Sequence, residues 1–114
     1  YTGDIALIPV FVGAWNSSNQ IQWNTVLGNL VSTLNAGSIN TAIHVLNTNS
    51  LYFSQKSAAI PTLTWYSNSF ITAPTATNVS DAQVGTYINN FISSNSAWIT
   101  TNVSSAKKKI FVYL

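Results

Sequence analysis

The run Ile5–Val12 (IALIPVFV) is a continuous apolar stretch of strand length near the start of this 114-residue chain. It does not alternate between apolar and polar residues, so we expect both faces of the strand to be buried, as in a parallel sheet that helices cover on both sides. Pro9 interrupts the run and has no backbone N–H, which predicts an edge or bulge position for it. Gly13 ends the predicted strand.

A first amphipathic helix is predicted at about residues 19–34. We expect Ser17 and Gln20 to form its capping box. Gly28 within this helix costs about 1 kcal/mol relative to alanine, which predicts close packing against a neighbouring element. The residues at helical spacing that form its predicted apolar face are Trp23, Val26, Leu27, Leu30, Val31 and Leu34.

A second amphipathic helix is predicted at residues 81–94. Ser80 and Gln83 fit a capping box, and Asp81 lies in the first turn, where the helix dipole favours an anion. The predicted apolar face consists of Val84, Tyr87, Ile88, Phe91 and Ile92. Trp98 follows in a segment that we expect to be a connection.

The other predicted elements are short. Residues 41–46 fit either a short helix or an extended segment, residues 51–53 fit a short strand, and residues 60–70 alternate as a strand does. Residues 110–114 (IFVYL) form a last apolar strand. This order predicts one α/β domain over residues 1–114, with a small, partly parallel sheet, two helices packed on it, and parallel pairing of the first and last strands.

The surface chemistry departs from that of an ordinary soluble domain. Charged residues make up 5% of the chain, against about 25% in a typical domain, and Ser, Thr and Asn fill the polar positions. The cluster Lys107–Lys109 is typical of a solvated turn, so we expect no nucleic-acid partner. No apolar run reaches the roughly 20 residues of a membrane span. Three N-glycosylation sequons start at Asn16, Asn78 and Asn102, each in a predicted loop or at a predicted helix start.

The sequence around the first and last strands resembles the phosphate-induced protein 1 family, the secreted EXORDIUM-like group of plants. The resemblance lies in residues 1–3 (YTG), the strand at residues 5–12, the turn at residues 13–16 (GAWN) and the apolar strand at residues 110–114. It departs from the family at Val12, where the family has tyrosine. The resemblance covers the N-terminal half of a family member, so the chain is expected to be the N-terminal part of a longer precursor. It implies an extracellular, cell-wall-associated protein without an established enzymatic activity.

Catalytic and metal-binding groups are scarce in the sequence. Asp4 precedes the predicted strand at residues 5–12, whereas Asp81 starts the predicted helix at residues 81–94. We therefore do not expect these two acids to form a catalytic pair. His44 lies between two apolar residues, as packed structural histidines do, and the chain has no cysteine. We therefore predict no enzyme, no metal site and no cofactor.

Two functions from different classes remain open. The first is a secreted, glycosylated structural subunit that assembles with copies of itself into a filament or a wall or surface layer. The second is a monomeric carbohydrate-binding or signalling module of the cell wall. Trp15 and Trp98 lie in predicted loops, where tryptophans either contact a polysaccharide or a protein interface or complete the core.

Overall fold

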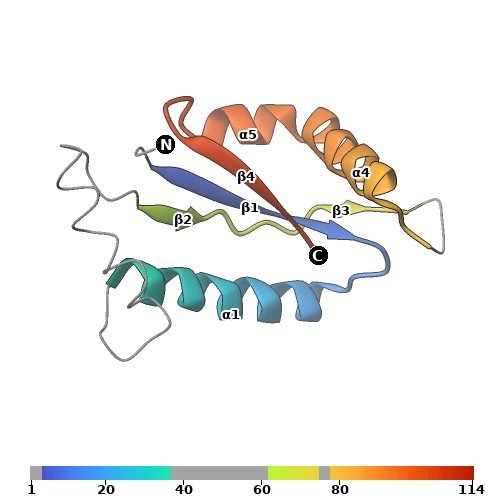
Figure 1. Ribbon diagram of the computed structural model, residues 1–114. Helices are drawn as coiled ribbons and strands as arrows, with labels where there is room; N and C mark the ends of the chain where they lie inside the picture. The colour runs from blue at the N-terminus through green and yellow to red at the C-terminus, as the bar shows by residue number, and fades with distance from the viewer. Residues whose placement is uncertain (1–3, 37–61, 75–77) are drawn as a thin grey trace.

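The computed structural model describes residues 4–36, 62–74 and 78–114. The predicted segments at residues 41–46 and 51–53, and His44, lie outside the described residues. The sheet lies between α1 on one face and α4 with α5 on the other (Figure 1), which confirms the predicted α/β fold. The elements in chain order are β1 (Ile5–Val12), α1 (Ser17–Ala36), β2 (Leu63–Trp65), β3 (Ile71–Thr72), α4 (Asp81–Ser94), α5 (Ser96–Asn102) and β4 (Lys108–Tyr113).

β1 is the central strand of the sheet, and every pairing among the described strands is parallel. β4 lies along one side of β1, with Ile5 opposite Lys108 and Val10 opposite Tyr113. The predicted parallel pairing of the first and last strands is therefore confirmed. β2 and β3 share the other side of β1, beside its start and its end respectively. Helices on both faces explain why β1 is apolar throughout.

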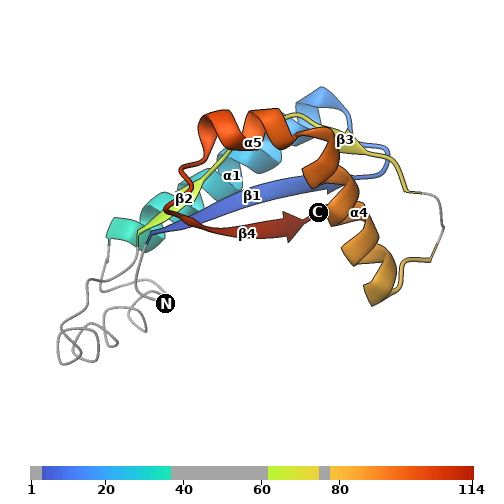
Figure 2. The ribbon, with the colours of Figure 1, turned by 90° about the horizontal axis from the view of Figure 1, so that it is seen from above.

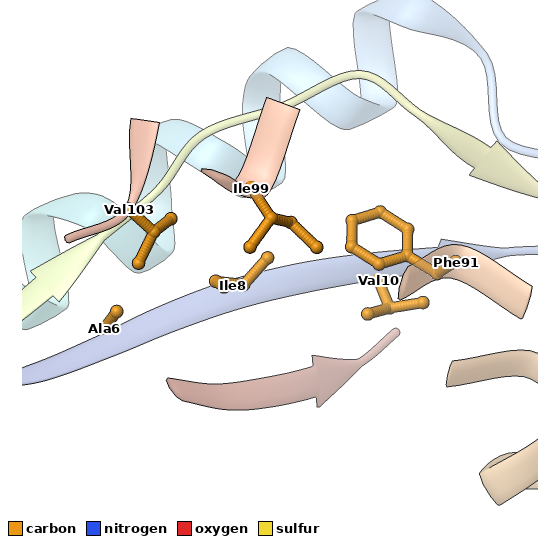
Figure 3. Packing of buried hydrophobic residues seen from close by; sticks show 6 residues of the cluster. All are labelled: Ala6, Ile8, Val10, Phe91, Ile99 and Val103. Carbon is orange, nitrogen blue, oxygen red and sulfur yellow. The ribbon is translucent and has the colours of Figure 1, made fainter. Parts of the chain in front are cut away.

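The main hydrophobic core lies between β1 and the α4–α5 layer. Figure 3 shows side chains of β1 beneath those of the two helices and of the residue after α5. Fully burying one such side chain contributes roughly 1.5–3 kcal/mol, so this layer is held firmly on the sheet. The core residues are Ala6, Ile8, Val10, Phe91, Ile99 and Val103.

Pro9 lies in the central strand, so the predicted edge or bulge position is wrong. The N–H of Ile5 and the carbonyl of Leu7 bond to the β2 side, so Pro9, two residues further on, faces the same way. It lies where β2 has ended and β3 has not begun, and the Nδ2 of Asn68 in this gap donates to its carbonyl at 3.1 Å. Pro9 is therefore tolerated because the neighbouring strand is interrupted there, and no ladder donor is required.

The N-cap of α1 is Asn16, one residue before the predicted Ser17. The Oδ1 of Asn16 accepts a hydrogen bond from the backbone N–H of Asn19 at 2.8 Å. The Gln20 side chain, expected in the capping box, is 2% exposed. Its Nε2 instead donates to the carbonyl of Phe70 at 3.5 Å, which connects α1 to the segment before β3.

The predicted apolar face of α1 is buried only in part. Val31 is 6% exposed, whereas Trp23 is 45%, Val26 54% and Leu30 52% exposed among the described residues. The predicted apolar face of α1 therefore packs on the sheet only in part. The periodicity identifies residues that share one side of the helix, but the width of the sheet decides how many of them are covered.

The position of α1 explains this partial burial. A Cβ at Gly28 would lie 3.6 Å from the Cδ1 of Trp65 in β2, which is an ordinary van der Waals distance, so Gly28 faces β2 but the predicted close packing that would require glycine is not found. The Nε1 of Trp65 also donates to the Oδ1 of Asn24 at 3.1 Å. Seen from above, α1 lies on the β2 and β3 side of the sheet, and β4 forms the opposite edge (Figure 2).

α4 has the predicted bounds and the predicted cap. The Oγ of Ser80 accepts from the N–H of Gln83 at 3.3 Å, and the N–H of Ser80 donates to the Oε1 of Gln83 at 2.8 Å. Trp98 lies in α5 rather than in a connecting segment, so that expectation is wrong. Asn95 separates the two helices, and both its N–H and its Nδ2 donate to the carbonyl of Phe91 at 3.0 Å.

Candidate interaction surface

The two predicted contact tryptophans take part in packing within the domain. The ring of Trp15 meets that of Phe11 edge to face at 5.0 Å, and its Nε1 donates to the carbonyl of Val12 at 3.1 Å. The ring of Trp98 meets that of Phe70 in the same way at 5.5 Å. Both tryptophans are half-buried. Their contacts agree with the core-completing role that the sequence left open for them.

The asparagines of all three sequons are exposed. Asn16 and Asn78 precede α1 and α4, as predicted, but Asn102 is the last residue of α5 rather than a loop residue. Asn16 uses only its Oδ1 as the helix cap, so its Nδ2 is available for a glycan. The Nδ2 of Asn102 donates to the carbonyl of Trp98 at 2.9 Å.

The few ionisable groups do not form a catalytic or metal site in the described ranges. Asp4 precedes β1 and Asp81 begins α4, and these elements begin at opposite ends of the sheet (Figure 1). No group of three or more metal-ligating side chains occurs in residues 4–36, 62–74 and 78–114. None of the helices in these ranges combines the length and the apolar character that crossing a bilayer requires.

The lysine cluster is partly built into the sheet. Lys108 and Lys109 are the first residues of β4, so the predicted solvated turn is wrong for them. The Nζ of Lys107 donates to the Oγ1 of Thr64 at 3.0 Å and lies 5.5 Å from the ring centroid of Tyr66. Since Thr64 is in β2, this side chain reaches across β1 and connects the two strands that flank it.

The described surface has two open hollows. One, of about 490 Å³, lies between α1 and β2 and is lined by Trp65 together with the hydroxyls of Ser32, Thr62 and Thr64. The other, of about 440 Å³, lies at the end of α5 and includes the side chain of Lys109. Both are shallow, and their polar groups are mainly neutral hydroxyls.

An apolar ledge on the surface is a feature that the sequence does not predict. We use this name for Trp23, Val26 and Leu30 of α1 together with Ile110 of β4, which is 43% exposed. Ile110 is paired with Leu7 of β1, and its neighbour Phe111 packs against Phe91 on the opposite face. Alternation along the strand therefore places Ile110 on the α1 face of the sheet.

The α1 part of the ledge points away from β2. At 3.6 residues per turn, Trp23, Val26 and Leu30 lie roughly a quarter turn from the buried Val31. They lie on the opposite side of the helix from Gly28, which contacts Trp65 of β2. β4 lies at the opposite edge of the sheet from β2 (Figure 2), so the flank of α1 that carries these three residues is on the side of the helix away from β2.

The outer edge of β4 carries backbone groups that β1 does not use. Lys108 donates its N–H to Asp4, and Leu114 bonds to both Val10 and Val12, so the even-numbered residues face β1. The odd-numbered residues Lys109, Phe111 and Tyr113 direct their N–H and C=O groups outward. Among the described strands, β4 pairs only with β1. The position of this strand at an edge of the described sheet was not predicted, because strand order does not follow from the sequence.

No protein-family model matches the chain, and no curated protein or solved structure is significantly similar to it. The resemblance to the phosphate-induced protein 1 family therefore stays a prediction. The apolar ledge and the β4 edge are the features from which a function can be inferred.

Proposed function

We propose that the chain is a secreted, N-glycosylated structural subunit without catalytic activity, which assembles with copies of itself into a filament or a wall or surface layer. The observation that carries this proposal is the apolar ledge, whose four side chains are each about half exposed. Three of these side chains lie along one side of α1, and exposed apolar side chains that are gathered in this way, unlike scattered ones, are typical of interaction sites.

The ledge is large enough for weak association. Covering a half-exposed Leu, Val, Ile or Trp side chain contributes about 0.75–1.5 kcal/mol, so four such residues from each of two copies contribute about 6–12 kcal/mol. Association itself costs about 4–15 kcal/mol. A contact made by the ledge alone is therefore weak, and a stable assembly requires either a second contact or many copies.

The charge pattern supports contact between copies. The formal net charge is +2, and only six residues are charged, so electrostatic repulsion between molecules is small. None of Asn16, Asn78 and Asn102 belongs to the ledge. Glycans at these three exposed positions therefore add solubility without being attached to the contact surface.

Sedimentation velocity over a wide concentration range tests the proposal. We expect the sedimentation coefficient of the wild type to rise with concentration, and Leu30→Lys to weaken this association at least tenfold. Ile21→Lys is the matched control, because Ile21 lies on another side of the same helix and is more exposed, at 67%. A wild type that stays monomeric throughout, or equal effects of the two variants, would show that the ledge is not a self-association surface.

The secreted, glycosylated part of the proposal has its own test. Peptide mapping by mass spectrometry of the protein purified from its natural source should find a glycan on at least one of Asn16, Asn78 and Asn102. Asn78 is the strongest candidate, since it lies outside the helices and strands and is exposed. Native protein without glycan at all three positions would contradict this part.

A carbohydrate-binding or signalling module of the cell wall is the second candidate. The hollow beside Trp65 favours it, because an indole ring among hydroxyl groups suits a sugar. Binding to insoluble wall polysaccharide that is lost in Ser32→Trp, which fills this hollow, and kept in Thr33→Trp would support the second candidate. Trp15→Ala and Trp98→Ala are poor tests, since both rings contribute to packing.

A further inference from the structure

We propose that two copies of this chain pair antiparallel along the outer edges of β4, about a two-fold axis at Phe111, so that the two sheets join into one. The inference rests on the proposed self-association and assigns its contact surface. A two-fold arrangement uses the same surface on both copies, so one strand edge is sufficient for the interface. Sheet extension of this kind is an established mode of strand recognition.

β4 is the described edge best suited to pairing. It runs without interruption over Lys108–Tyr113. The opposite side of the sheet consists of β2, with three residues, and β3, with two, and the chain leaves the ladder between them. Continuous main-chain pairing with a second copy is therefore possible along β4 but not along β2 and β3.

The outward backbone groups select the register. In an antiparallel pair, residues that exchange hydrogen bonds must both have their N–H and C=O directed at the partner strand. Centring the axis on Phe111 pairs it with Phe111 of the second copy and pairs Lys109 with Tyr113 of the second copy. All three outward-facing residues of β4 are then used in each copy. If the two β4 strands are shifted by two residues relative to each other, in either direction, at least one of these outward-facing residues has no partner within β4 of the second copy.

The charge pattern selects the direction. In a parallel, in-register pair, Lys109 of the two copies would lie about 4.8 Å apart across the ladder, and Lys108 would add to the repulsion. In the antiparallel pair, the two Lys109 side chains are four residues apart along the strands, about 14 Å. This separation exceeds a Debye length of about 8 Å at physiological salt. Each Lys109 lies instead beside the ring of Tyr113, a favourable partner for an ammonium group.

The same register covers apolar surface on the α1 face. Ile110, which is 43% exposed, comes to lie opposite Val112 of the second copy. Both residues face the α1 side, so the contact continues the apolar ledge across the two-fold axis. Tyr113, at 36% exposure, is covered on the other face. The proposed pairing therefore combines main-chain hydrogen bonds with burial of side chains that the described chain leaves exposed.

Engineered disulfides test this register directly, because the chain contains no cysteine. Ile110 and Val112 of opposite copies form a non-hydrogen-bonded pair with a Cα separation of about 4.5 Å, within disulfide range. We expect the double variant Ile110→Cys/Val112→Cys to form covalent dimers under mild oxidation. The control Ile71→Cys/Ala73→Cys has the same spacing at the other side of the sheet, and it should remain monomeric on non-reducing gels.

A single cysteine distinguishes the two directions. In the antiparallel register, residue 110 of the second copy lies diagonally, about 8 Å away, beyond disulfide range. Ile110→Cys alone should therefore stay monomeric. Efficient cross-linking of this single variant would indicate a parallel pair and overturn the proposal.

A backbone variant covers the case in which the cysteines disturb folding. Tyr113→Pro removes an outward N–H that β1 does not use, so the ladder to β1 stays intact. We expect it to weaken association at least tenfold, while Tyr113→Phe, which keeps the N–H and the ring, associates like the wild type. Equal association of the two variants would contradict pairing along β4.

The outcomes separate this inference from the proposed function. A wild type that associates in the ultracentrifuge, with no cross-link in the 110/112 variant, leaves self-association standing and overturns the β4 edge as its surface. A wild type that is monomeric at all concentrations overturns both. Cross-linking of the 110/112 variant but not of the 71/73 variant or of Ile110→Cys supports both self-association and the β4 edge; because a two-fold contact closes on itself, growth into a filament or layer requires a further contact.

Discussion

Replacing Asn68 by alanine should destabilise the fold by about 2–4 kcal/mol. Asn68 lies in the gap between β2 and β3, where the ladder to β1 is interrupted. Its Nδ2 donates to the carbonyls of Pro9 at 3.1 Å and Tyr66 at 3.4 Å, and its Oδ1 accepts from the N–H of Phe70 at 3.3 Å. One side chain thus replaces the ladder bonds that the interruption removes.

The magnitude follows from the groups that lose their partner. Pro9 is fully buried, and leaving its carbonyl without a hydrogen bond costs about 1–3 kcal/mol. The N–H of Phe70 belongs to a partly buried residue, and losing its hydrogen bond to Asn68 destabilises the fold by about 1 kcal/mol more. In a domain of this size, 1 kcal/mol corresponds to roughly 4 °C in Tm, so we expect Tm to fall by about 8–16 °C.

Urea unfolding followed by tryptophan fluorescence and circular dichroism measures this loss. Asn90→Ala is the matched control, because Asn90 is an exposed residue of α4, and its replacement should change stability by only a few tenths of a kcal/mol. Asn68→Asp keeps the shape but has no donor when ionised, so it should destabilise at least as much as Asn68→Ala. If Asn68→Ala and Asn90→Ala unfold within 0.5 kcal/mol of each other at equal m-values, roughly the error of such measurements, the reasoning is refuted.

Three further substitutions each act on a single element or turn. Gly85→Ala in α4 should stabilise the protein by about 0.5–1 kcal/mol, because a Cβ there meets nothing within 4 Å. Gly13→Ala should destabilise it by about 1–2 kcal/mol, because Gly13 has φ +104°. Thermal unfolding should therefore show Tm shifts of opposite sign for the two variants, and shifts of the same sign would contradict these predictions. Ser80→Ala should cost about 1 kcal/mol by removing half of the α4 capping box and should speed amide exchange in the first turn of α4. Unchanged exchange at Gln83 would show that the cap is not needed there.

The elements that depend on local chemistry were predictable from the sequence. The unbroken apolar run identifies β1 as a strand buried on both faces, and the reciprocal bonds of Ser80 and Gln83 mark the start of α4. The cap of α1 was wrongly predicted at Ser17, because Asn16 and Ser17 are both good N-cap residues and the spacing of Ser17 and Gln20 imitates a capping box. The burial of Gln20 against Phe70, fifty residues away, is a tertiary contact that no local pattern reveals.

The sequence predicts the separate elements that carry the candidate surface, but not how they are arranged. The periodicity of α1 correctly places Trp23, Val26 and Leu30 on one side of a helix, but it does not say which element covers that side. Likewise, the apolar sequence at residues 110–114 predicts a strand but not that it lies at an edge of the described sheet. Both points concern the arrangement of elements, which depends on strand order and sheet width.

The ledge and the β4 edge share a topological cause. α1 follows β1 in the chain and lies on one face of the sheet, on the side of β2. α4 and α5 precede β4 and lie on the other face. The α1 face beneath β4 is therefore covered by no helix in the described chain, which exposes both Ile110 and the flank of α1 carrying Leu30. In the proposed pair, the two-fold axis is perpendicular to the sheet, so the α1 helices of both copies lie on the same face and direct these flanks towards each other. Leu30→Lys should accordingly reduce disulfide formation in the Ile110→Cys/Val112→Cys variant, while Ile21→Lys should not. An undiminished yield with Leu30→Lys would mean that the ledge and the β4 edge make separate contacts.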